Sequence, residues 1–171
     1  GFNFADKILI ISSIILFHLL PIFVTNFFFK KVFNYLKKNI FKILLLFTVL
    51  IYFFNYQIIY TGGGVFFQLS NFFFENNYFF YIISFLSLSF ICYLSSLNLN
   101  NFLLITFLIL SNIQNSIYHK YYEPLVVILF FTLFQNVAAE DFLKKRFNLI
   151  LIYGFSLIYI LLRLYKSYQL S

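Results

Sequence analysis

One short segment of the chain gathers side chains that can bind a phosphate and move a proton. It contains two basic groups, a phenol and a carboxylate: His119, Lys120, Tyr122 and Glu123. Lysine offers a point charge, histidine titrates near neutrality, and a low local dielectric strengthens the interaction of both with an anion. The preceding polar stretch, 111–116, would be costly against lipid, so it should face protein or water. The alternative is a solvated loop with interfacial tyrosines.

The eight residues of this segment, 118–125, read YHKYYEPL. They resemble a loop of the multi-span GT-C glycosyltransferases, which has the pattern His-Lys-x-x-Arg-Tyr/Phe-x-x-Pro and lies near the phosphate of a polyprenyl-linked sugar donor. The resemblance implies that His119 and Lys120 contact that phosphate on the outer face of the membrane. Here the arginine is absent and the proline follows more closely.

The same enzymes carry a catalytic acidic residue in their first outer loop. None of the five acidic residues of this chain is a convincing equivalent, so the catalytic residue is unassigned. The resemblance then implies the later part of a larger enzyme. The chain contains no methionine and begins at Gly1, which also indicates a fragment.

A glycine run provides a second candidate feature. Gly62, Gly63 and Gly64 can present backbone N–H groups to an anion, although no Lys-Ser/Thr pair follows them and no strand precedes them. Glu75 occurs in the same segment, 61–77, which we expect to be interfacial or re-entrant, and this segment is a candidate acceptor loop in which Glu75 meets an acceptor sugar or a cation. The alternatives are a flexible turn and an exposed interfacial carboxylate.

His18 and Cys92 are two further candidate residues, because ionisable or reactive groups are rare inside apolar runs. His18 precedes Pro21 in the first run, and a neutral imidazole there can either function or simply bond to a neighbouring helix. No second histidine or carboxylate stands at ligand spacing, so we expect no metal and no cofactor. Cys92 is the only cysteine, which excludes an intramolecular disulfide and a zinc cluster.

The elements that position these residues are predicted to be membrane helices. The chain is 63% hydrophobic and only 10% charged, with a mean hydropathy of +0.92, and its apolar runs approach twenty residues. These values predict an all-α bundle of about six spans in a lipid bilayer. The expected spans are 7–29, with a kink at Pro21, and 40–60, 78–97, 102–118, 124–139 and 148–164.

Lysine and arginine set the expected orientation. The segments 30–42 and 140–147 hold most of the positive charge, so the positive-inside rule makes both cytoplasmic and places the Gly62 and His119 segments on the outer face. Because topology accounts for the net charge of +7, we expect no nucleic-acid partner. We expect a multi-pass protein of a bacterial inner membrane, or alternatively of an organelle inner membrane.

Two functions are therefore considered. The first is a glycosyltransferase fragment that moves a sugar from a polyprenyl-phosphate donor at the outer membrane face. The alternative is a noncatalytic hydrophobic subunit of a larger membrane complex or transporter, in which the spans are packing surfaces that meet other membrane subunits.

Overall fold

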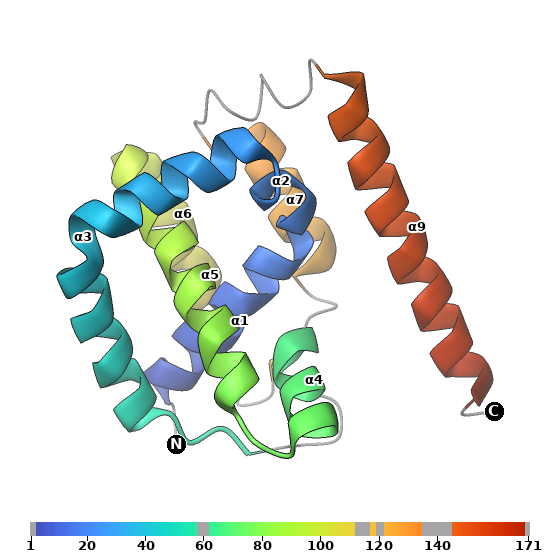
Figure 1. Cartoon of the computed structure of the whole chain (residues 1–171), viewed down its shortest axis with the longest axis horizontal. Helices are drawn as coiled ribbons and strands as arrows, with labels where there is room; N and C mark the ends of the chain where they lie inside the picture. Colours follow the sequence, from blue (N-terminus) through green and yellow to red (C-terminus); the bar gives the residue numbers. More distant parts are fainter. Residues whose placement is uncertain (1–2, 58–61, 112–116, 119–121, 135–144, 170–171) are drawn as a thin grey trace.

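The computed structural model is helical throughout the part of the chain that it describes, namely residues 3–57, 62–111, 117–118, 122–134 and 145–169 (Figure 1). These residues contain no strand. Their helices are α1 (Phe4–His18), α2 (Leu20–Phe23), α3 (Asn26–Phe53), α4 (Gly64–Phe74), α5 (Tyr78–Leu97), α6 (Leu99–Leu110), α7 (Glu123–Thr132) and α9 (Arg146–Gln169). The all-α prediction is confirmed for this part of the chain.

The first apolar run does not form one kinked helix over 7–29, as the sequence had suggested. Helix α1 starts after Asn3, whose side chain accepts a hydrogen bond from the Ala5 amide, and it stops at His18. Leu19 leaves the helical conformation, and Pro21 sits in the first turn of α2. Proline is tolerated there, whereas farther inside a helix it removes a backbone hydrogen bond and clashes with the preceding turn.

The second expected span, 40–60, begins directly after a kink inside helix α3. Helix α3 starts at Asn26, within the basic segment, is interrupted by non-helical backbone at Asn39, and ends at Phe53. At the bend, the side-chain amide of Asn39 donates to the Tyr35 carbonyl at 3.1 Å, and the backbone angles of Asn39 are not helical. Side-chain bonds of this kind compete with the helix ladder, which accounts for the bend.

Helix α5 is the centre of the fold and coincides with the expected span 78–97. Its 20 residues are long enough to cross a bilayer, at roughly 30 Å. It packs against α1, α3, α4 and α6. Small side chains allow the close approach to α1, where the Ser12 and Ser87 hydroxyls lie 3.2 Å apart.

The remaining expected spans overlap helices where the structure describes them. Helix α6, at 99–110, overlaps the span expected at 102–118, and α7, at 123–132, overlaps that expected at 124–139; residues 112–116 and 135–139 of these spans lie outside the described residues. Helix α9 extends the expected 148–164 at both ends. Within the described residues, α5 alone is both long and apolar enough to cross a membrane, and α4, α6 and residues 146–161 of α9 are shorter apolar helices.

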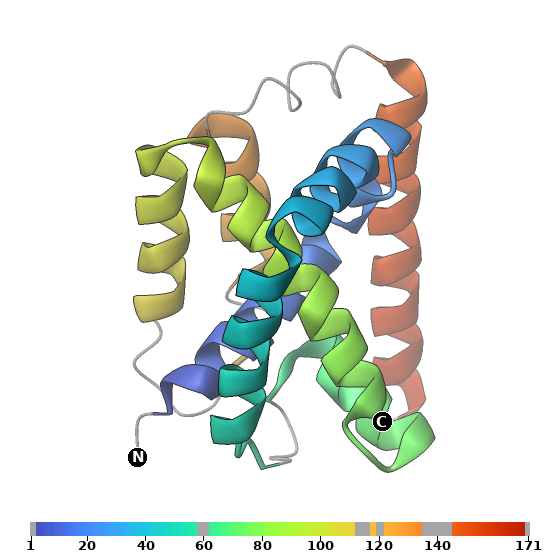
Figure 2. The ribbon, with the colours of Figure 1, turned by 60° about the vertical axis from the view of Figure 1, so that its left-hand side comes forward.

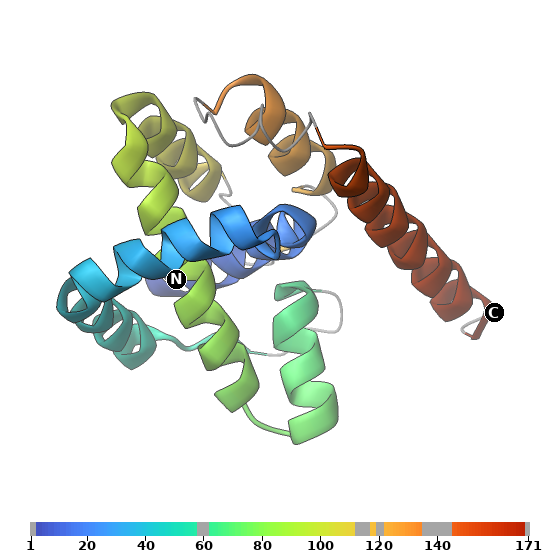
Figure 3. The ribbon, with the colours of Figure 1, turned by 45° about the horizontal axis from the view of Figure 1, so that its top comes forward.

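The charged segments are divided between the two ends of the bundle (Figure 2). The first half of α3 lies at the same end as the start of α9. The start of α1, the end of α3 and the end of α4 lie at the other end. Figure 3 shows the first half of α3 crossing α5, where the rings of Tyr35 and Tyr93 meet at 5.8 Å.

Candidate functional site

The structure describes only part of the segment that the sequence singled out. His119 and Lys120 lie outside the described residues. Glu123 is the first residue of α7, but the structure describes only its backbone and not its side chain. Tyr122 is buried in the hydrophobic core, and its carbonyl accepts the Val126 amide at 2.8 Å. The contact of these four residues with a donor phosphate stays a prediction.

The glycine run forms a tightly packed turn at the start of α4. Gly63 and Gly64 have φ of 93° and 76°, which L side chains rarely adopt. A Cβ on Gly64 would lie 2.9 Å from Cγ1 of Ile14, in the middle of α1, and a Cβ on Gly62 would overlap the Tyr56 hydroxyl. The turn therefore enters the bundle and brings the start of α4 against α1. It needs glycine for its shape and for its close approach to these neighbours.

One hydrogen bond joins this turn to Ile117, two residues before His119, and a second joins Ile117 to Tyr56, whose hydroxyl lies against Gly62. The Gly63 amide donates to the Ile117 carbonyl at 3.0 Å, and the Ile117 amide donates to the Tyr56 hydroxyl at 3.3 Å. Gln68, one turn into α4, donates to the Gly62 carbonyl at 3.1 Å. Two segments that the sequence treated separately, 62–64 and 117–118, thus belong to one site.

A buried carboxylate adjoins this site, and sequence reasoning passed over it. Asp6 is 8% exposed, and its Oδ1 accepts the Asn55 amide at 2.9 Å. Its charge acts on the hydroxyl of Tyr56, the residue after Asn55. Burial raises the pKa of the Asp6 carboxyl, and hydrogen bonds from Asn55 and Asn3 partly offset that rise.

One sequence signal pointed to Asp6. It is the only acidic residue among the first 74, and it stands directly before the first long apolar run. The sequence does not reveal its hydrogen-bond partner, the backbone amide of Asn55, which is 49 residues away along the chain. That separation explains why the carboxylate looked like an ordinary helix-start residue.

Glu75, by contrast, is separated from the glycine turn. It caps the other end of α4 in a left-handed conformation, with φ of 53°, and its side chain is exposed. The intervening 11-residue helix spans roughly 16 Å. The expected acceptor loop of Gly62, Gly63, Gly64 and Glu75 is therefore a packed turn plus a distant exposed carboxylate.

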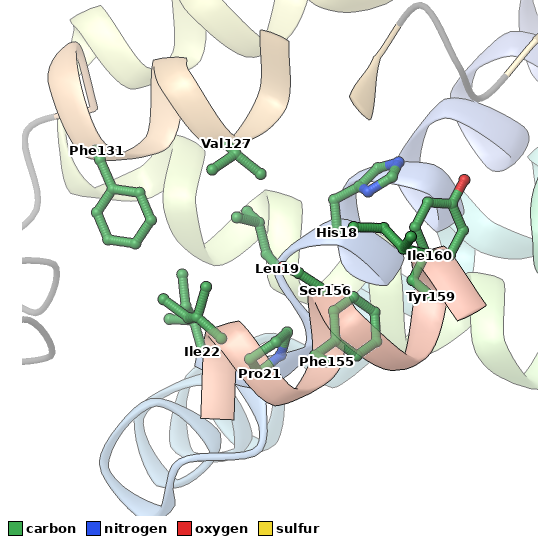
Figure 4. Close-up of a pocket in the computed structure, with 11 residues that line it drawn as sticks. His18, Leu19, Pro21, Ile22, Val127, Phe131, Phe155, Ser156, Tyr159 and Ile160 are labelled. Atoms are coloured by element: carbon green, nitrogen blue, oxygen red, sulfur yellow. The ribbon is translucent and has the colours of Figure 1, made fainter. Parts of the chain in front are cut away.

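A small cavity lies at the far end of α1 from Asp6 (Figure 4). Its volume is about 130 Å³, and α1, α2, α7 and α9 line it mainly with apolar side chains. His18 lies on its wall beside Tyr159, with ring centroids 6.4 Å apart. Twelve residues of α1 separate His18 from Asp6, or roughly 18 Å, so the cavity is distinct from the surroundings of the Asp6 carboxylate. No group of His, Cys, Asp and Glu among the described residues is suited to a metal.

Comparisons of the chain with protein-family models, with curated proteins and with solved structures found no match. A function is therefore inferred from the side chains and contacts of the chain itself.

Proposed function

We propose that the chain is the membrane-embedded part of a glycosyltransferase that moves a sugar from a polyprenyl-phosphate donor at the outer face of a bacterial inner membrane. One observation carries the proposal. Ile117, two residues before His119 in the sequence, is hydrogen-bonded to Gly63 and to the Tyr56 hydroxyl, and the charge of the buried Asp6 carboxylate acts on that same hydroxyl. A cation-bearing segment beside a carboxylate is what transfer from a phosphate-linked sugar requires.

The proposal includes about six membrane crossings, several of them made by broken or short helices. Large apolar side chains point outward on several elements, including Phe41 at 86%, Tyr52 at 83% and Phe72 at 79% exposure. Water does not favour so much exposed apolar surface, whereas lipid does. Non-helical backbone at membrane depth is tolerated where protein buries it, and the packed Gly62 turn meets that condition.

In the proposed reaction, an acceptor hydroxyl attacks the anomeric carbon of the donor sugar. The bond between that carbon and the phosphate oxygen breaks, and polyprenyl phosphate leaves with the electron pair. His119 and Lys120 stabilise the phosphate charge, and Asp6 takes the proton of the attacking hydroxyl. A carboxylate whose pKa burial has raised is a better general base than an exposed one.

Tyr122 and Glu123 keep a secondary part in this proposal. Tyr122 anchors the start of α7 in the core, two residues after Lys120 in the sequence, and Glu123 is the first residue of that helix. Glu75 lies too far along α4 to meet the same substrate atoms as Asp6 and remains a candidate for contact with a distant part of the acceptor.

A noncatalytic membrane subunit is the second candidate, and the outer surface of α9 favours it. Ile150, Leu157 and Ile158 are each more than half exposed on that helix. Such a surface suits a neighbouring subunit as well as it suits lipid. On this reading the buried polar groups near Asp6 only hold loops together.

Transfer of a radiolabelled sugar from a polyprenyl-phosphate donor by the complete protein in liposomes separates the two functions. Lys120→Ala removes a charge-assisted contact of roughly 1.5–3 kcal/mol, so we expect transfer to fall tenfold to more than a hundredfold. His119→Ala should act in the same direction. Lys145→Ala, a matched loss of one exposed charge directly before α9, should change transfer little. Full transfer by both loop variants at equal expression rejects the site.

A further inference from the structure

The first half of α3 combines a row of lysines with exposed aromatic side chains, and the proposed reaction uses neither. Helix α3 contains five lysines and no acidic residue. Four of these lysines are exposed: Lys30, Lys37, Lys38 and Lys42. Exposed ammonium groups on a surface of this length need either an anionic partner or water around them.

The helix divides into three sectors around its axis at about 100° per residue. Val32 and Leu36 form the buried sector and fasten the helix to the bundle. Phe29 and Phe33 lie to one side of it, nearly half exposed, with their rings stacked at 6.1 Å. The lysines occupy the sector opposite the buried stripe.

The aromatic and cationic sectors meet along one line. The Lys37 ammonium lies 4.7 Å from the centre of the Phe33 ring. The ammonium therefore lies over the face of this ring, as in a cation–π contact. Membrane proteins place aromatic rings and lysines together at headgroup depth, where the ring enters the acyl boundary and the ammonium can reach the phosphates.

Among the carboxylates that the structure describes, none lies at this end of the bundle. The two carboxylates whose side chains the structure describes, Asp6 and Glu75, belong to the other end of the bundle. At the lysine end, the start of α9 adds Lys145 and Arg146, which are exposed as well. An anionic surface is the complementary partner.

We infer that residues 26–42 form an interfacial helix that binds anionic phospholipid headgroups, with Lys30, Lys37 and Lys38 contacting the phosphates. The inference requires the chain to lie in a bilayer, as proposed above, but it does not require sugar transfer. Each lysine near an anionic membrane surface strengthens binding by roughly fivefold at low salt. The helix then fixes the depth and tilt of the bundle at that leaflet.

Lipid-specific quenching of a fluorophore on the full chain tests the inference. In a Cys92→Ala background, one protein carries the fluorophore at Asn34→Cys, among the lysines, and another carries it at Ile82→Cys, an exposed position on α5. Both proteins are placed in phosphatidylcholine bilayers with 30% phosphatidylglycerol. In one experiment the phosphatidylcholine carries brominated acyl chains that quench the fluorophore, and in the other the phosphatidylglycerol carries them. The ratio of the two quenching efficiencies reports the local enrichment of the anionic lipid.

We expect severalfold enrichment at position 34 and none at position 82. Lys37→Gln with Lys38→Gln should abolish the enrichment, and Lys37→Arg with Lys38→Arg should keep it. The matched control, Lys145→Gln with Arg146→Gln, removes the same charge elsewhere and should leave the enrichment at position 34 largely intact. Equal ratios at both labels, or equal losses in both glutamine pairs, overturn the inference. Absence of quenching by either lipid at position 82 contradicts the membrane placement instead.

Discussion

Replacement of Asp6 separates a structural role from a chemical one. Asp6→Asn keeps an oxygen that accepts the Asn55 amide but cannot take a proton, whereas Asp6→Ala leaves that amide without its acceptor. Loss of a partly buried hydrogen bond costs about 1 kcal/mol, so the alanine variant should unfold more readily than the asparagine variant. If Asp6 is the general base, both variants should lose transfer by roughly a hundredfold or more.

Stability should also respond to pH in a direction set by the Asp6 environment. Because burial raises the pKa of Asp6 in the fold, the folded protein favours the protonated carboxyl. This contribution to stability is complete below the ordinary pKa of aspartate and is lost as the pH rises through the raised value. Asp6→Asn should remove that part of the pH dependence.

The assay pairs sugar transfer in liposomes with thermal unfolding in detergent, followed by circular dichroism between pH 4 and 8. The expected outcome is an asparagine variant that folds normally and is inactive. Normal transfer by Asp6→Asn would refute the chemical role, and identical unfolding of both variants would refute the importance of the Asn55 contact.

Two other predictions concern the turn and the orientation. Gly63→Ala puts a side chain on left-handed backbone, at φ 93°, and against the Phe67 ring, so it should lower the free energy of unfolding by about 2 kcal/mol and lower the unfolding temperature with it. Gly154 is a helical position with open space around it, so Gly154→Ala should leave the unfolding temperature unchanged or raise it. A destabilised Gly154 variant with a stable Gly63 variant would contradict the packing described here. Single cysteines at Asn34 and Glu75, in a Cys92→Ala background, should react with a membrane-impermeant reagent from opposite sides of the bilayer. Reaction from the same side would remove the orientation argument.

Sequence reasoning succeeded where one local feature decided the structure. The α5 run consists of 20 residues bounded by Asn77 and Asn98, so composition alone set both ends. It erred over 26–39, because lysines read as a connector although their long stems let a helix continue while the ammonium groups reach solvent. The break at Leu19 was placed only approximately, since Pro21 marks the region of a break but not its residue.

The candidate site was predicted in pieces because its contacts are long-range. Gly63 belongs to a glycine run that stands out in the sequence, but Ile117 is an ordinary apolar residue, and only folding reveals the hydrogen bond between them. Asp6 was missed for the same reason, since Asn55 supplies its partner from the end of α3. Residue type identified His119 and Lys120 as cations and Glu123 as a carboxylate in the same segment, but pattern alone did not point to Asp6.

A photoreactive polyprenyl-phosphate sugar tests the central claim most directly. Reacted with the complete protein in liposomes and mapped by mass spectrometry, it should attach to peptides that contain Gly62–Gly64 or 117–123, and unlabelled donor should suppress the attachment. Attachment confined to the cavity beside His18 and Tyr159, or attachment that unlabelled donor does not suppress, would contradict the assignment of the donor site.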